Sequence, residues 1–124
     1  MSQVIEVTEA TFSSEVAGAT KPVLVDYWAD WCAPCKQLSP IIEEIAAAHS
    51  DKMTFAKVDT EDQQELSAGL EITSIPTIMA FRAGYLVFRQ SGLLQGRQLD
   101  ELIEKVKEID VEDLKKQAAA QNQG

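Results

Sequence analysis

The 124-residue sequence contains only two cysteines and one histidine. Two cysteines are too few for the disulfide framework of a small secreted protein. A closed zinc site needs four nitrogen or sulfur ligands, so it would require carboxylates or a second subunit here. No run approaches the ~20 apolar residues that cross a bilayer. The 11 basic residues form no cluster against 20 acidic ones, and the formal charge of −9 argues against a nucleic-acid partner.

What is present is the composition of an ordinary globular protein, with 45% hydrophobic and 25% charged residues. A single core accounts for a chain of this length, and no internal repeat is visible. The N-terminal segment 1–12 has neither the basic region nor the continuous apolar region of a secretion signal. We therefore expect a cytoplasmic monomer without membrane contact, in a compartment that keeps its thiols mostly reduced.

Apolar periodicity predicts alternating strands and helices followed by a β-hairpin. The segment 23–29 is almost continuously apolar, as expected for a central strand that is buried on both faces. The other strands are predicted at 4–7, 53–58, 77–81 and 86–90, and the helices at 12–17, 35–46, 63–68 and 99–106. This order indicates an α/β fold in which a central mixed sheet carries helices on both faces, a three-layer sandwich.

The last residues read as an addition to this fold, so we divide the chain into a domain at 1–109 and a C-terminal extension at 110–124. Asp110 is a predicted N-cap with an acid, Asp113, three positions later, which predicts a short helix. The segment 117–124 consists of Ala, Gln, Asn and Gly residues with nothing to anchor it. We expect the helix to fray there.

Both cysteines stand where the central strand gives way to a helix, in the sequence Cys32-Ala33-Pro34-Cys35. A helix N-terminus favours negative charge because its backbone N–H groups are unpaired, so the thiolate of Cys32 is stabilised there. Cys35, one turn further, is placed to attack a mixed disulfide formed at Cys32. Pro34 suits the first turn, which needs no N–H. The spacing alone is also compatible with half a zinc site or an inert thiol pair.

Asp26 is unusual because it interrupts the predicted central strand. A carboxyl group in a low-dielectric core has a raised pKa, and such an acid can accept a proton from Cys35. Two simpler readings remain open at this stage: an exposed edge residue, or a buried structural pair with Lys57 on the next strand. His49 lies near the predicted end of a helix, where we expect its imidazole to face solvent.

These residues belong to a larger set of motifs. Asp26 to Cys35 spell D-x-W-A-x-W-C-x-P-C, and Lys36 follows. The remainder are Pro40 inside the helix, A-K-V-D at 56–59, I-P-T at 75–77, Gly84 and Gly92. Across residues 4–109 the sequence resembles the bacterial-type thioredoxin family. It differs from the commonest family motif in carrying Ala33 in place of a glycine, and the added methyl group restricts the turn.

The resemblance implies the thioredoxin fold and a thiol–disulfide oxidoreductase, an electron carrier that reduces protein disulfides. Cys32 would be the nucleophile and Cys35 the resolving thiol, so that the two form a redox-active disulfide. Asp26 would assist proton transfer, and Lys57 would tune it. Pro76 would follow a cis peptide bond, and Trp28 would pack beneath the site. The implied substrate-binding rim consists of Trp31, Ala33, Pro34, Ile75, Pro76 and Gly92.

The resemblance also implies partners. No bound cofactor or metal is expected, and electrons would come indirectly from NADPH through thioredoxin reductase. Disulfide-containing proteins such as ribonucleotide reductase, peroxiredoxin and methionine sulfoxide reductase would be substrates. Two alternatives are a non-catalytic binding module or holdase that uses the apolar rim, and a metal or iron–sulfur site shared across a dimer.

Overall fold

The computed structural model of the chain describes residues 2–122. Its five strands form one mixed sheet in the order β1-β3-β2-β4-β5, in which β1, β3 and β2 are parallel while β4 and β5 are antiparallel to their neighbours. The strands are β1 (Val4–Glu6), β2 (Val23–Trp28), β3 (Thr54–Asp59), β4 (Thr77–Arg82) and β5 (Tyr85–Ser91). The helices are η1 (Ser13–Ala17), α1 (Ala33–His49), α2 (Gln64–Gly69), α3 (Gly96–Glu108) and α4 (Val111–Asn122).

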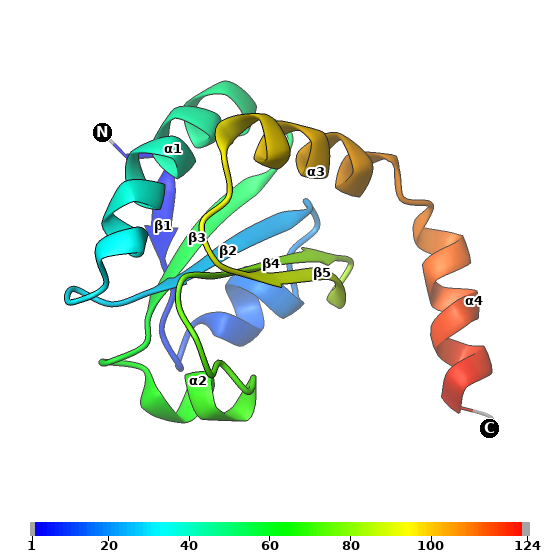
Figure 1. The fold of residues 1–124 in the computed structure, drawn as a ribbon. Coiled ribbons are helices and arrows are strands. Elements are labelled where there is room, and N and C mark those ends of the chain that lie inside the picture. The colour runs from blue at the N-terminus through cyan, green and yellow to red at the C-terminus, as the bar shows by residue number, and fades with distance from the viewer. Residues whose placement is uncertain (1, 123–124) are drawn as a thin grey trace.

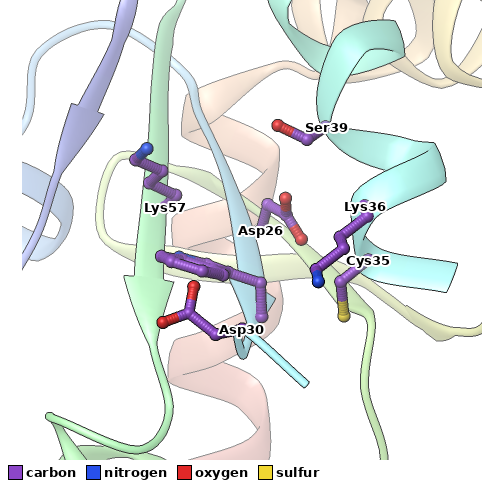
Figure 2. A pocket seen from close by; sticks show the side chains of 7 residues that line it. Asp26, Asp30, Cys35, Lys36, Ser39 and Lys57 are labelled. Carbon is purple, nitrogen blue, oxygen red and sulfur yellow. The ribbon is translucent and has the colours of Figure 1, made fainter. Parts of the chain in front are cut away.

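Helices cover both faces of this sheet, so the predicted three-layer architecture is confirmed (Figure 1). Alternate residues of β2 point to opposite faces, as the pleat of a strand requires. Leu24 belongs to the core under α1 and α3, and Val25 belongs to the core under η1 and α2. Because Asp26 is two positions after Leu24, its carboxyl group also points toward α1 (Figure 2).

The β4–β5 hairpin closes with a tighter turn than the predicted four-residue loop. Ala83 and Gly84 are its two turn residues, and both have positive φ angles, of 53° and 84°. Two-residue turns of this handedness match the twist of the paired strands. A methyl group at Gly84 would lie 2.8 Å from the Ala17 carbonyl oxygen, so this position has no room for a side chain.

The C-terminal helix is longer than the sequence suggested. Asp110 does act as its N-cap, since Oδ1 accepts the N–H of Glu112 at 2.9 Å. The expected fraying from Gln117 onward is not found, because α4 continues to Asn122. Its three consecutive alanines, residues 118–120, are strong helix formers. Residues 123 and 124 of the predicted frayed tail lie outside the described residues.

His49 differs from the expected solvent-facing imidazole. It is the last residue of α1, and only 19% of its side chain is exposed. Its Nε2 lies 3.4 Å from Asp100 Oδ1 and its Nδ1 lies 3.1 Å from Lys107 Nζ, both on α3. The imidazole therefore links the two helices on this face of the sheet. Within residues 2–122, no helix has the length and apolar character that a membrane span requires.

Candidate active site

The two cysteines lie where β2 leads into α1, as predicted. Cys32 is the N-cap of α1, with extended backbone angles (φ −91°, ψ 104°), and its Sγ accepts the backbone N–H of Cys35 at 3.2 Å. Pro34 occupies the first helical turn. The two sulfurs are joined in a disulfide, with the Cα atoms 5.2 Å apart. The helix start therefore holds both sulfurs together and offers a backbone donor to the Cys32 sulfur.

Burial does not distinguish the two cysteines in this disulfide form, because Cys32 is 3% exposed and Cys35 is 2% exposed. Their surroundings differ. Cys32 is flanked by the exposed residues Trp31, Ala33 and Pro34, whereas Cys35 lies inside the helix and lines a cavity behind the disulfide. An incoming protein therefore meets the Cys32 side of the pair first.

A second loop, at Ile75 and Pro76, faces Trp31, the residue before Cys32. The Ile75–Pro76 peptide bond is cis, and the Pro76 carbonyl oxygen accepts the N–H of Gly92 at 2.8 Å. Pro76 is buried, Ile75 is half-buried and Gly92 is exposed. A groove of about 230 Å³ runs between Trp31 and the segment 72–75. The structure thus brings part of the predicted rim together around one shallow groove.

Trp31 is the most exposed large apolar side chain of this surface, with 68% of the residue accessible. Its indole Nε1 donates a hydrogen bond to Glu61 Oε1 at 2.7 Å. Glu61 is 30 positions further along the chain and carried no signal in the sequence that linked it to the site. This hydrogen bond fixes the orientation of an indole ring that otherwise faces water.

Asp26 is buried, with 5% of the residue exposed, which rules out the edge-strand reading. Its Oδ1 has no hydrogen-bond partner among residues 2–122. Burial raises the pKa of this carboxyl group from 3.8 to about 7, and the positive charge of Lys57 acts in the opposite direction. The carboxyl group therefore exchanges its proton near neutral pH.

A cavity of about 110 Å³ connects Asp26 with the inner cysteine. Figure 2 shows the Asp26 carboxyl group pointing from β2 toward α1, where Cys35 and Ser39 lie one helical turn apart. Lys57 faces the same cavity from β3, in register with Asp26. The other residues that line it are Trp28, Asp30 and Lys36.

Lys57 is half-buried and its Nζ lies 5.5 Å from the centre of the Trp28 ring. An ammonium group over an indole face is attracted by the electrons of the ring, which favours this position of the lysine. The half-buried Trp28 therefore packs beside the site and helps to hold Lys57 near Asp26. No cluster of three or more metal-ligating His, Cys, Asp or Glu residues occurs in the described part of the chain.

Three residues that line the cavity were not predicted from the sequence. Asp30, Lys36 and Ser39 line it, yet none was assigned a role from its pattern. For Ser39 a signal was available, because residues four positions apart share one face of a helix and Ser39 is four positions after Cys35. A polar residue at that position, opposite a buried acid, indicates a polar cavity behind the cysteines.

The arrangement defines a class of protein. An α/β sheet presents a disulfide at a helix N-terminus, a cis-proline loop beside it and a buried acid behind it, which together suit exchange of electrons between sulfur pairs. The Thioredoxin family matches residues 3–108. The chain belongs to the thioredoxin family.

Named relatives agree with this membership. Thioredoxin from Mycobacterium bovis is 43% identical over 91 residues, which are 73% of this chain and 78% of that protein. Thioredoxin 1 from a Nostoc species is 38% identical over 105 residues, covering 85% of this chain and 98% of that protein. A bifunctional thioredoxin reductase/thioredoxin from Mycobacterium leprae is 44% identical over 88 residues, 71% of this chain and 19% of that protein.

The chain is therefore a thiol–disulfide oxidoreductase that reduces protein disulfides, and its redox centre is the Cys32–Cys35 pair. Both the fold and this activity are as the sequence predicted. The thioredoxin family binds no prosthetic cofactor, because the two sulfurs themselves carry the electron pair.

Proposed function

We propose that this chain is a bacterial-type thioredoxin with a WCAPC active site, in which Cys32 attacks the substrate. The observation that carries the assignment is the hydrogen bond from the Cys35 N–H to the Cys32 sulfur at the start of α1. In the reduced protein that donor and the helix dipole stabilise a Cys32 thiolate. The thiolate attacks a substrate disulfide, forms a bond to one substrate sulfur and releases the other as a thiolate.

Cys35 completes the reaction. Its thiol gives a proton to the Asp26 carboxylate, and the resulting thiolate attacks the Cys32 sulfur. The Cys32–Cys35 bond forms, the bond between Cys32 and the substrate breaks, and the substrate leaves with both sulfurs reduced. The cavity shared by Asp26 and Cys35 supports this assignment, because a carboxyl group with a pKa of about 7 both accepts and returns a proton at neutral pH.

Lys57 tunes this proton acceptor. Its positive charge opposes the effect of burial and keeps the pKa of Asp26 from rising further. The partial exposure of the lysine limits the strength of that interaction. In this proposal Lys57 keeps enough Asp26 ionised at neutral pH for Cys35 to be deprotonated.

The rim selects extended disulfide-containing segments. In this proposal one side of the rim consists of Trp31, Ala33 and Pro34, which are exposed next to Cys32 in the chain, and the other side consists of Ile75, Pro76 and Gly92. The groove shared by Trp31 and Ile75 supports this pairing. The backbone of Ile75 would pair with the substrate as with an added strand. Ala33 limits the conformational freedom of the turn in the reduced state, so we expect a reduction potential different from that of a glycine-containing site.

Thioredoxin reductase is the proposed electron donor, with NADPH as the original source. The relative from M. leprae supports this partner, since its name joins both activities in one protein. Ribonucleotide reductase, peroxiredoxin and methionine sulfoxide reductase are proposed substrates. We place the protein in the cytoplasm as a monomer, with a catalytic domain at 1–109 and an extension at 110–124 whose role the site does not require.

Replacement of Asp26 by asparagine is expected to slow the resolving step. An amide cannot accept the Cys35 proton, so we expect a decrease of about tenfold to a hundredfold at pH 7. Reaction of the reduced protein with 5,5′-dithiobis(2-nitrobenzoate) releases one thionitrobenzoate on attack by Cys32 and a second on resolution by Cys35. Stopped-flow absorbance separates the two phases. The first phase should be unaffected, and an unchanged second phase from pH 6 to 8 would contradict the role of Asp26.

A further inference from the structure

The buried carboxyl group of Asp26 needs a route by which its proton reaches solvent. Its Oδ1 is buried against protein and has no hydrogen-bond partner among residues 2–122. Asp26 also lines the cavity behind Cys35, which offers its carboxyl group a path toward solvent. A cavity of about 110 Å³ has room for several water molecules, because a single water needs about 10–15 Å³. The residues along this cavity therefore decide how protons enter and leave.

Ser39 stands on the helical side of that cavity. It lies one turn after Cys35 on the same face of α1, and the residue as a whole is exposed to solvent. Figure 2 shows its hydroxyl group directed into the space between α1 and the side chain of Lys57. Ser39 thus touches both the cavity that contains Asp26 and the bulk water outside it.

The chemistry of the wall favours Ser39 over its neighbours as a proton relay. The charged groups that face Asp26 are Lys57 from β3, Asp30 after β2 and Lys36 from α1. An ammonium group only donates hydrogen bonds, a carboxylate only accepts them, and the Trp28 indole only donates. A hydroxyl group does both at the same time. Apart from the reacting thiol of Cys35, Ser39 is the one cavity residue able to pass a proton at neutral pH without a change of charge.

We propose that Ser39 is a positioning residue whose hydroxyl group, together with water in the cavity, passes the proton between Asp26 and solvent. The inference rests on the proposed role of Asp26 as proton acceptor. In resolution, the Cys35 thiol first gives its proton to the Asp26 carboxylate. Water then takes the proton from Asp26 and gives it to the Ser39 oxygen, which releases its own proton to solvent. Because the proton has left Asp26, it cannot return to the Cys35 thiolate. That thiolate then attacks the Cys32 sulfur, the Cys32–Cys35 bond forms and the substrate sulfur leaves.

The test compares Ser39→Ala with two controls in the two-phase thionitrobenzoate reaction. Ser39→Ala should lower the rate of the second phase about threefold to tenfold at pH 7 and leave the first unchanged, because only the relay is lost. Ser39→Thr keeps a hydroxyl group and should retain the wild-type rate. Gln37→Ala changes an exposed residue of the same helix outside the cavity and should have no effect. Imidazole, a small proton carrier, should restore the Ser39→Ala rate as its concentration rises.

The double variant Asp26→Asn/Ser39→Ala separates this inference from the proposed function. If Ser39 acts through Asp26, the double variant should resolve no more slowly than Asp26→Asn alone. A slow second phase in Asp26→Asn with a wild-type rate and pH profile in Ser39→Ala would overturn the relay and leave the role of Asp26 intact. A further loss in the double variant would also overturn it. A wild-type second phase in Asp26→Asn would remove the proposed role of Asp26 and the relay with it.

Discussion

Replacement of Cys32 by serine is expected to abolish the reduction of insulin disulfides. A serine hydroxyl is almost entirely protonated at pH 7 and forms no disulfide, so the first covalent step has no nucleophile. We expect a loss of at least about a thousandfold, measured as insulin turbidity with dithiothreitol as the electron source and corrected for the uncatalysed rate. Circular dichroism of the variant would establish that the fold is retained.

Cys35→Ser is the matched control, because it removes the second sulfur and leaves the first at the helix N-terminus. This variant should also lose turnover, but it should accumulate as a mixed disulfide with the substrate. Non-reducing gel electrophoresis and mass spectrometry would detect that adduct in Cys35→Ser and none in Cys32→Ser. The reverse pattern, an adduct in Cys32→Ser alone, would exchange the roles of the two cysteines.

Asp26→Asn is expected to be more stable than the wild type at and above neutral pH. The folded protein holds the pKa of Asp26 at about 7, against 3.8 for an unperturbed aspartate. Between these values the folded state binds more protons than the unfolded state, so the free energy of unfolding of the wild type falls as pH rises from about 4 to about 7. Protonated Asp26 thus contributes roughly 3–5 kcal/mol to the free energy of unfolding of the wild type. This contribution is complete below the pKa of the unfolded state and is lost above the pKa of the folded state.

Asparagine carries no charge at any of these pH values, so the variant should not show that loss. Urea unfolding of both oxidised proteins at pH 4, 6 and 8 would give the free energies of unfolding. The difference in the free energy of unfolding between variant and wild type should be small at pH 4 and reach its maximum by pH 8. Asp30→Asn, at an exposed acid on the same cavity, should change stability by less than about 0.5 kcal/mol. A gap that does not vary with pH would mean that the Asp26 carboxylate is not held in a desolvated site.

The same substitution is therefore expected to stabilise the protein and to slow its chemistry. Both results together would indicate that the buried acid is retained for proton transfer and not for stability. They would also exclude the remaining structural reading of Asp26, a buried pair with Lys57. A carboxyl group paired with Lys57 for structural reasons alone would lose stability on replacement by asparagine.

Local patterns were sufficient for the fold. The apolar run at 23–29 predicted the central strand β2, and the periodic apolar residues after Cys35 predicted α1. The position of the C-x-x-C pair between a predicted strand and a predicted helix was enough to place the pair at a helix N-terminus. Each of these features depends on residues close together in the chain, which is why they were visible in one sequence.

Contacts between distant segments could not be predicted in this way. The hydrogen bond from Trp31 to Glu61 and the contacts of His49 with α3 join residues 30 to 58 positions apart. Ser39 was missed because its role depends on the acid across the cavity, on another element. The length of α4 was underestimated because the Gln, Asn and Gly residues of segment 117–124 predicted fraying, whereas the three alanines at 118–120 favour a helix.

In the proposed reaction the attacking sulfur is that of Cys32, at the amino end of α1. The most direct test is alkylation of the reduced protein with a limiting amount of iodoacetamide at pH 7, followed by peptide mass mapping. Thiols in such positions have lowered pKa values, thioredoxin itself being an example, so the Cys32 peptide should carry the label first, roughly tenfold faster than a model thiol. Preferential labelling of Cys35, or a Cys32 rate no greater than that of the model thiol, would show that Cys32 is not the activated nucleophile.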